Sequence, residues 1–204
     1  MEIIMIKMLF VALCGALLCQ QAVAASLDGF GRHYNARCAA PAAKIDSERA
    51  LPAKFRSRNF PIVLERTTLD DIQQQFKGDI QKNDREEWLC YHSQAENLTW
   101  WFISRTDIEH GNLSTIMLSA IDNKAHCDIP ARPIYLSGVT VPSLGATRSE
   151  VADYFKSPAS ARASCQQFET RADSKDESTI NALRYYYENN QVAGMSFEQL
   201  TTNG

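Results

Sequence analysis

The residues of this chain that could do chemistry are histidines, cysteines and adjacent acids. Four histidines are present: His33, His92, His110 and His126. None of them stands in an H-E-x-x-H motif or at another metal-ligand spacing. The adjacent acids are Asp70-Asp71, Glu86-Glu87 and Asp176-Glu177. Such pairs are more often solvated than catalytic, and the first pair suits the start of a helix, whose dipole favours negative charge.

Two histidines lie close to cysteines in the sequence. Cys90 precedes His92 by two residues and His126 directly precedes Cys127, so both pairs could suit a metal ion or a reactive thiol. A cysteine in a disulfide is neither a ligand nor a nucleophile. Ser143-Leu144-Gly145 lacks the G-x-S-x-G elbow, and the chain has no glycine-rich phosphate loop. The sequence therefore predicts no enzyme, no metal site and no cofactor.

The first 24 residues have the pattern of a signal peptide. A charged start precedes an apolar run from Met8 to Leu18, and the small-residue site Ala22-Val23-Ala24 follows. The run is too short for a transmembrane helix, which needs ~20 apolar residues. Neither Cys14 nor Cys19 follows a small residue, as an acylated lipoprotein cysteine would. We expect cleavage after Ala24 and a periplasmic or secreted protein without membrane insertion or a lipid anchor.

Composition narrows the class of partner. The chain has 21 basic and 24 acidic residues and a net charge of −3, whereas a nucleic-acid binder carries a basic footprint. The mature part of the 204-residue chain is long enough to bury a substantial core. In a eukaryotic host Asn97 and Asn112 would be glycan acceptors, but the short signal favours a bacterial periplasm.

Four cysteines would remain in the mature chain: Cys38, Cys90, Cys127 and Cys165. An even number in an oxidising compartment predicts two disulfides, for which three connectivities are open. The motif C-x-x-P-A begins at Cys38 and again at Cys127, and a helix and a second cysteine follow each copy. This order favours one disulfide within each copy, Cys38 with Cys90 and Cys127 with Cys165. The alternative is that a five-residue motif recurs by chance.

The two expected helices share one pattern. One opens at Thr68 and ends at Phe76-Lys77, and the other opens at Thr147 and ends at Phe155-Lys156. Each has threonine at the N-cap, an acid three residues later, and apolar residues at the fourth and eighth positions. The sequence thus predicts an α+β fold made of two tandem repeats, 25–125 and 126–204, behind the signal peptide of residues 1–24.

Each helix is followed by three expected strands, so that each repeat is a capped helix packed on an antiparallel meander. The first set covers residues 87–93, 98–105 and 113–121, and the second covers 163–171, 181–189 and 191–200. Asn189-Asn190 suits the hairpin turn between the last two strands.

Alternation along these strands assigns side chains to the two faces of each sheet. Trp100 and Phe102 are expected to oppose Trp101 and Ile103. Similarly, the buried set Leu183, Tyr185 and Tyr187 should oppose Arg184, Tyr186 and Glu188. Because interfaces favour exposed Trp, Tyr and Arg, we predict partner-binding residues at Trp101, Arg184, Tyr186 and, in a connecting hairpin, Asp107, Glu109 and His110. The alternative is that the aromatic residues are core and the hairpin is an ordinary surface loop.

The helix-opening stretches carry a resemblance to a known family. The segments 144–151, Leu-Gly-Ala-Thr-Arg-Ser-Glu-Val, and 67–72, Thr-Thr-Leu-Asp-Asp-Ile, are similar to those of the β-lactamase inhibitor protein family. The chain also resembles its single-unit relatives, the outer-membrane assembly lipoproteins of the SmpA/OmlA type. The resemblance implies a concave sheet surface, studded with aromatic residues, that grips another protein. The chain departs from the family where a cysteine precedes each helix.

Three functions follow from these patterns. The first is a periplasmic inhibitor or immunity-type protein that occludes an enzyme or toxin with one surface made by both sheets. The second is an accessory protein of envelope or outer-membrane assembly. The third is a small-molecule carrier, or an enzyme whose site has no recognised motif. Export without an anchor and the lack of catalytic motifs favour the first.

Overall fold

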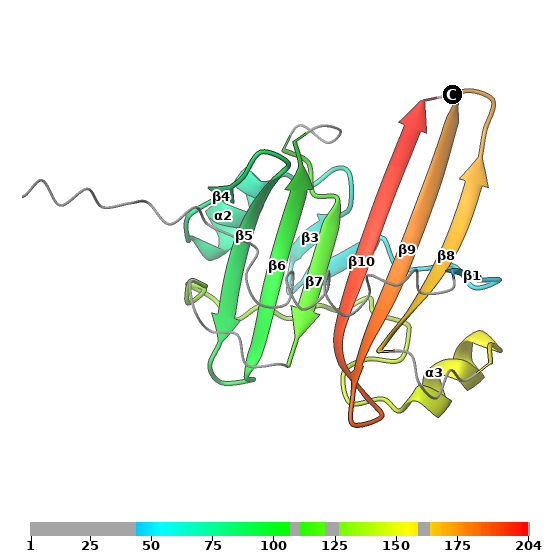
Figure 1. The fold of residues 1–204 in the computed structure, drawn as a ribbon. Helices are drawn as coiled ribbons and strands as arrows, with labels where there is room; N and C mark the ends of the chain where they lie inside the picture. The colour runs from blue at the N-terminus through cyan, green and yellow to red at the C-terminus, as the bar shows by residue number, and fades with distance from the viewer. Residues whose placement is uncertain (1–43, 107–110, 121–126, 159–163, 204) are drawn as a thin grey trace, which may run out of the picture.

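The computed structural model describes residues 44–106, 111–120, 127–158 and 164–203, and Figure 1 shows their arrangement. The expected signal peptide and Cys38 lie outside these ranges. The described residues form an eight-stranded sheet, a separate two-stranded hairpin and two helices. This mixed architecture is compatible with the predicted α+β class.

The elements have the following bounds. The large sheet comprises β1 (Lys44–Asp46), β4 (Gln81–Lys82), β5 (Glu86–Ser93), β6 (Leu98–Arg105), β7 (Thr115–Ser119), β8 (Cys165–Asp173), β9 (Glu177–Glu188) and β10 (Gln191–Asn203). The hairpin comprises β2 (Lys54–Ser57) and β3 (Phe60–Val63). The helices are α2 (Leu69–Phe76) and α3 (Arg148–Phe155).

The large sheet joins two antiparallel meanders. Its strand order is β1-β8-β9-β10-β7-β6-β5-β4, so β5-β6-β7 and β8-β9-β10 each pair in chain order and meet where β10 pairs with β7. Short strands lie at both edges, β4 beside β5 and β1 parallel to β8. Short edge strands hinder the pairing of the sheet with other chains.

The observed strands lie close to the predicted ranges. Strand β7 is shorter than the predicted range 113–121, because regular pairing begins at Thr115 and ends at Ser119. The predicted turn between β9 and β10 is confirmed, since Asn189 and Asn190 have φ angles of 48° and 67°. Asparagine tolerates this left-handed conformation, which a tight hairpin turn requires at both central positions.

Helix α2 begins with the predicted capping box. The Thr68 hydroxyl accepts from the Asp71 N–H at 3.1 Å, and the Asp71 carboxylate accepts from the Thr68 N–H at 3.0 Å. The Leu69 N–H donates to the Gly111 carbonyl at 3.1 Å, just before β7. This bond places the helix so that Ile72 and Phe76 are buried.

Helix α3 repeats this arrangement in the second half of the chain. Thr147 and Glu150 form a capping box, and the bond from the Thr147 N–H lowers the pKa of the exposed Glu150 carboxyl. The Arg148 N–H donates to the Asn190 carbonyl at 3.2 Å, just before β10. The first turn of each helix is therefore bonded to the residues that lead into the third strand of the meander that follows it.

The main core lies on one face of the large sheet, which we call the first face. Helices and hairpin cover this face (Figure 1). Rings on the covering elements contact rings on the strands: Phe76 with Phe102 at 6.4 Å between centroids, Phe155 with Phe168 at 3.8 Å, and Phe55 with Phe197 at 4.9 Å. The opposite face, which carries neither helix, is the second face.

Glu65 closes an unpaired edge of the sheet. Strand β10 runs past the start of β7, so its last residues pair with β9 alone. There the Glu65 carboxylate accepts from the Thr201 N–H at 2.5 Å, from the Thr201 hydroxyl at 2.7 Å and from the Gln199 side-chain amide at 2.7 Å. Glu65 itself has a φ of 59°. A side chain thus takes the place of a neighbouring strand.

We predict that Glu65→Ala lowers the free energy of unfolding by about 1 to 3 kcal/mol, because it leaves a backbone donor of β10 without its acceptor. Chemical denaturation of the protein measures this loss. Glu177→Ala is the matched control, since Glu177 lies beside the same sheet edge and is exposed. Equal midpoints for the two variants would contradict the role given to Glu65.

Candidate protein-binding surface

The second face carries an aromatic cluster at the centre of the sheet. The cluster consists of Trp88, Cys90, Trp101, Ile103, Met117, Cys165 and Tyr186. Strand pairing brings it together: Cys90 lies opposite Trp101, Trp101 opposite Met117, and Cys165 opposite Tyr186. The cluster therefore spans both meanders.

The predicted division of side chains between the faces is confirmed. Trp100 and Phe102 belong to the main core, whereas Trp101 and Ile103 belong to the aromatic cluster. Tyr185 and Tyr187 likewise lie in the main core, opposite Tyr186. The alternation of side chains along a strand is sufficient for this result.

The predicted exposure of two residues is wrong. Trp101 is 1% exposed and Tyr186 is 5% exposed, although both lie on the face away from the helices. Arg184, also on this face, is half-buried. The three residues thus share one face, but of the three only Arg184 is partly exposed. Asp107, Glu109 and His110 lie outside the described residues.

We predict that Trp101→Ala lowers the free energy of unfolding by about 3 to 5 kcal/mol, as expected for a buried tryptophan. Leu200→Ala, a change at a half-buried position of the same face, should cost much less. Thermal melts of the two variants beside the parent protein measure the difference. A Trp101→Ala melt that matches that of Leu200→Ala would show that the tryptophan is not structural.

A chain of polar contacts borders the aromatic cluster on strands β1, β8 and β9. The Arg184 Nε donates to the Gln167 side-chain carbonyl at 2.6 Å, the Gln167 amide donates to the Glu169 carboxylate, and Lys44 forms a salt bridge with Glu169 at 3.1 Å. Burial removes water from the guanidinium group and so lowers the pKa of Arg184, whereas the negative charge of Glu198 acts to raise it. Arg184 is thus held by Gln167, whose own side chain is held by Glu169.

Beyond this network the second face is partly exposed. Cross-strand pairs place Ile180 opposite Arg171 and Leu200, and Ala182 opposite Glu198. We call these five residues the outer patch; four are half-buried and Arg171 is exposed. The patch thus combines apolar side chains with charged ones, and a protein interface likewise has an apolar centre and a polar rim. The sequence does not reveal this patch, because its strand ends lack aromatic residues.

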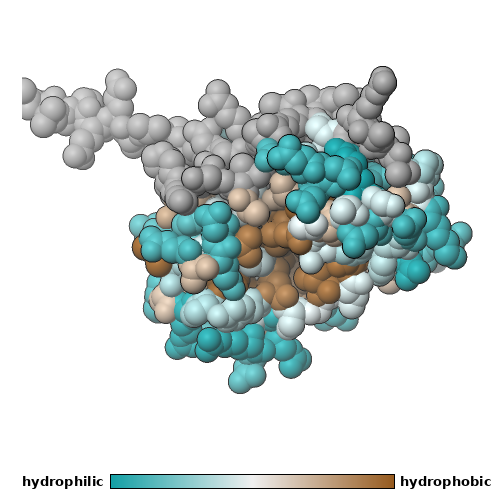
Figure 2. Space-filling view, turned by 90° about the horizontal axis from the view of Figure 1, so that it is seen from below, coloured by the Kyte–Doolittle hydropathy of each residue, from teal (hydrophilic) through white to brown (hydrophobic). Residues whose placement is uncertain are grey.

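A second apolar area is visible from below the molecule (Figure 2). Apolar residues gather there in a hollow between hydrophilic flanks. The strand ends on this side of Figure 1 carry Leu98, Leu118 and Val192, which belong to the main core or pack against it. We therefore interpret the hollow as the end of the core and place the candidate surface on the second face.

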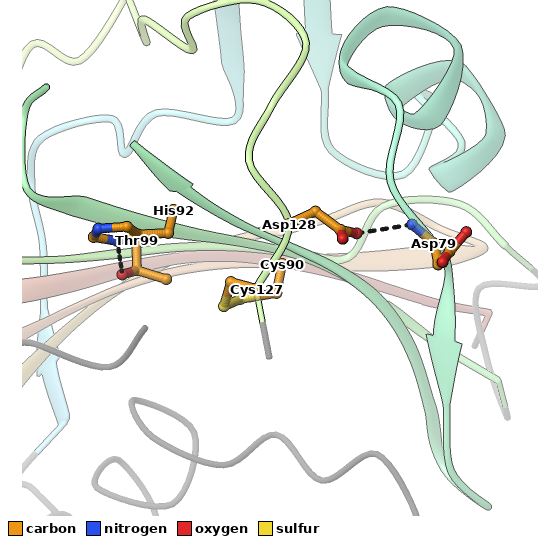
Figure 3. The surroundings of a disulfide bond; sticks show 6 residues. All are labelled: Asp79, Cys90, His92, Thr99, Cys127 and Asp128. Carbon is orange, nitrogen blue, oxygen red and sulfur yellow. Dashed lines mark hydrogen bonds between the residues drawn. A yellow bond between two sulfur atoms is a disulfide. The ribbon is translucent and has the colours of Figure 1, made fainter. Parts of the chain in front are cut away.

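The disulfides differ from the predicted pairing. Cys90 is bonded to Cys127, with 4.7 Å between their Cα atoms (Figure 3). The next residue explains the position of Cys127: the Asp128 N–H donates to the Cys90 carbonyl at 2.9 Å, and the His92 N–H donates to the Asp128 carbonyl at 2.8 Å. The segment after Cys127 thus lies along the edge of β5. Cys127 therefore bonds to Cys90 in β5 and not to Cys165 in β8.

Asp128 also secures the loop after α2. Its carboxylate accepts from the Asp79 N–H at 2.9 Å. Burial, reinforced by the Asp128 charge, raises the pKa of the Tyr91 hydroxyl, which donates to the Lys77 carbonyl at 2.5 Å. These contacts are structural.

His92 points away from the disulfide toward Thr99, with 3.1 Å between His92 Nδ1 and Thr99 Oγ1.

Cys165 is also disulfide-bonded. The other two cysteines of the described residues are bonded to each other, so the partner of Cys165 lies outside this part of the chain. Of the cysteines there, Cys14 and Cys19 fall in the expected signal peptide. Cys38 remains, and it precedes β1, which pairs in parallel with β8, the strand of Cys165.

We predict that non-reducing peptide mapping of the oxidised protein finds two linked pairs, Cys90 with Cys127 and Cys38 with Cys165. The same digest after reduction is the control. A peptide that links Cys38 to Cys90 would contradict the observed pairing, and a free Cys38 would contradict the inferred one.

The described residues hold no group of three His, Cys, Asp or Glu side chains that could bind a metal ion. None of their helices is long and apolar enough to cross a membrane. A comparison with known proteins finds no family model, no curated protein and no solved structure that matches the chain.

Proposed function

We propose that this chain is an exported protein-binding protein of the inhibitor or immunity type, which occludes an enzyme or toxin with the second face of its sheet. The outer patch carries this proposal. It combines half-buried apolar side chains with charged neighbours on a sheet face that neither helix covers. Binding at such a surface needs no catalytic group of its own.

Arg184 supports the assignment by its position between the outer patch and the aromatic cluster. Arginine is enriched among the residues that dominate interface energies. Here the guanidinium is held by Gln167 and partly desolvated before any partner binds. An arginine fixed in advance loses less conformational entropy on binding than a mobile one.

We further propose that the chain is a tandem duplication, as in the β-lactamase inhibitor protein family that its helix openings resemble. Two capping boxes, Thr68 with Asp71 and Thr147 with Glu150, occupy matching places before the two meanders. Matching bonds join the Thr67 carbonyl to the N–H of Leu113, just before β7, and the Ala146 carbonyl to the N–H of Val192, near the start of β10. A duplication with its third strands paired gives one wide face, which is suited to a protein partner.

The proposal is tested by capture from a periplasmic extract with immobilised mature protein. We expect Ile180→Asp combined with Leu200→Asp to weaken capture of a specific protein by roughly 30-fold, the equivalent of about 2 kcal/mol for a hot spot. Tyr135→Ala is the control. Its side chain is 47% exposed but belongs to the segment beside β2, away from the second face.

Capture must also alter an activity for the inhibitor function to hold. The captured protein should be an enzyme or toxin whose activity falls to zero at a molar ratio near one. Capture of an outer-membrane assembly component, with no inhibited activity, would favour the accessory function instead. Equal capture by the double variant and the Tyr135 control would refute the binding surface.

A further inference from the structure

The aromatic cluster on the second face is buried more deeply than the sheet alone can explain. Trp88 and Trp101 are each 1% exposed, yet a tryptophan has roughly 250 Å² to cover. Neighbours within a sheet shield the sides of a ring but not its outward surface. Among the described hydrophobic residues, Cys127 packs against this cluster as a partly buried neighbour. A single small side chain cannot cover two indole rings.

We propose that the N-terminal segment of the mature chain, residues 25–43, is the occupant of this face. Two observations fix its C-terminal end there. Residue 44 begins β1, which pairs with β8 at the edge of the sheet. Cys165, a member of the cluster, is disulfide-bonded to a cysteine outside the described residues. Cys38 is the cysteine available for this bond.

The length of the segment is sufficient to cross the face. Five strand spacings separate β8 from β5 in the sheet order, a distance of about 24 Å at ~4.8 Å per spacing. Residues 25–37, which precede Cys38, span about 43 Å when extended at ~3.3 Å per residue. The segment also supplies apolar side chains, Leu27, Phe30 and Tyr34, which would bury surface against the tryptophans.

The competing occupant within the chain is the link between β7 and Cys127, residues 121–126. Its sequence is Ile-Asp-Asn-Lys-Ala-His. It has one large apolar side chain, Ile121, and its ends are set by β7 and the disulfide. It therefore offers much less apolar surface than residues 25–43. A second copy of the protein is the remaining alternative.

Photo-crosslinking decides between these occupants in the intact protein. Past the expected signal peptide the chain has two methionines, Met117 in the aromatic cluster and Met195 in the main core. Photo-methionine therefore reports on the two faces separately. We expect Met117 to crosslink to peptides from residues 25–37 and Met195 not to do so.

Crosslinks from Met117 to residues 121–126 alone would overturn the proposal, and so would their complete absence. Protein mixed from two isotope labels identifies crosslinks between copies, which would overturn it as well.

A second measurement uses point variants of the full mature chain. Leu27→Asp combined with Phe30→Asp should make the oxidation of Met117 by peroxide at least about tenfold faster while that of Met195 stays slow. Ser26→Asp is the matched control. Unchanged oxidation of Met117 in the double variant would overturn the proposal. Faster oxidation of both methionines indicates unfolding, and the crosslinks of the parent protein then decide. Neither measurement involves a partner, so the outcome is independent of the proposed function.

Discussion

The antiparallel pairing of β10 with β7 is the interaction on which the rest of the structure depends. Five residue pairs, from Gly194 with Ser119 to Glu198 with Thr115, join the two meanders into one sheet. Each three-stranded meander alone would leave a long strand edge unpaired, which invites association with other chains. Joining the edges removes this problem and creates two wide faces. The helices and the hairpin pack on the first face, whereas the second face carries neither helix.

Much of this arrangement follows from local sequence patterns. The Thr-x-x-Asp and Thr-x-x-Glu capping boxes are complete within four residues each. Strand alternation assigned Trp100 and Trp101 to opposite faces because side-chain direction has a period of two residues. The Asn189-Asn190 turn likewise depends on the conformational preference of one residue type. These features could be predicted because their causes lie within a few neighbouring residues.

The features that could not be predicted depend on contacts between distant segments. Cys127 bonds to Cys90 because the segment that follows it pairs with β5, and no local pattern encodes that pairing. Trp101 and Tyr186 were placed on the correct face but are buried, since burial depends on what covers the face. Glu65 bonds to a strand more than a hundred residues later, a contact that only the tertiary fold reveals.

The second face therefore has two parts with different roles. The aromatic cluster and the disulfide stiffen its centre, whereas the outer patch and Arg184 remain accessible. The most direct test of the central claim is hydroxyl-radical footprinting of the protein alone and bound to its captured partner. The account predicts that Ile180 and Leu200 lose reactivity in the complex while Ile129 and Tyr135, the exposed large apolar residues elsewhere on the described surface, keep theirs. Protection of Ile129 and Tyr135 with unchanged reactivity at Ile180 and Leu200 would contradict it.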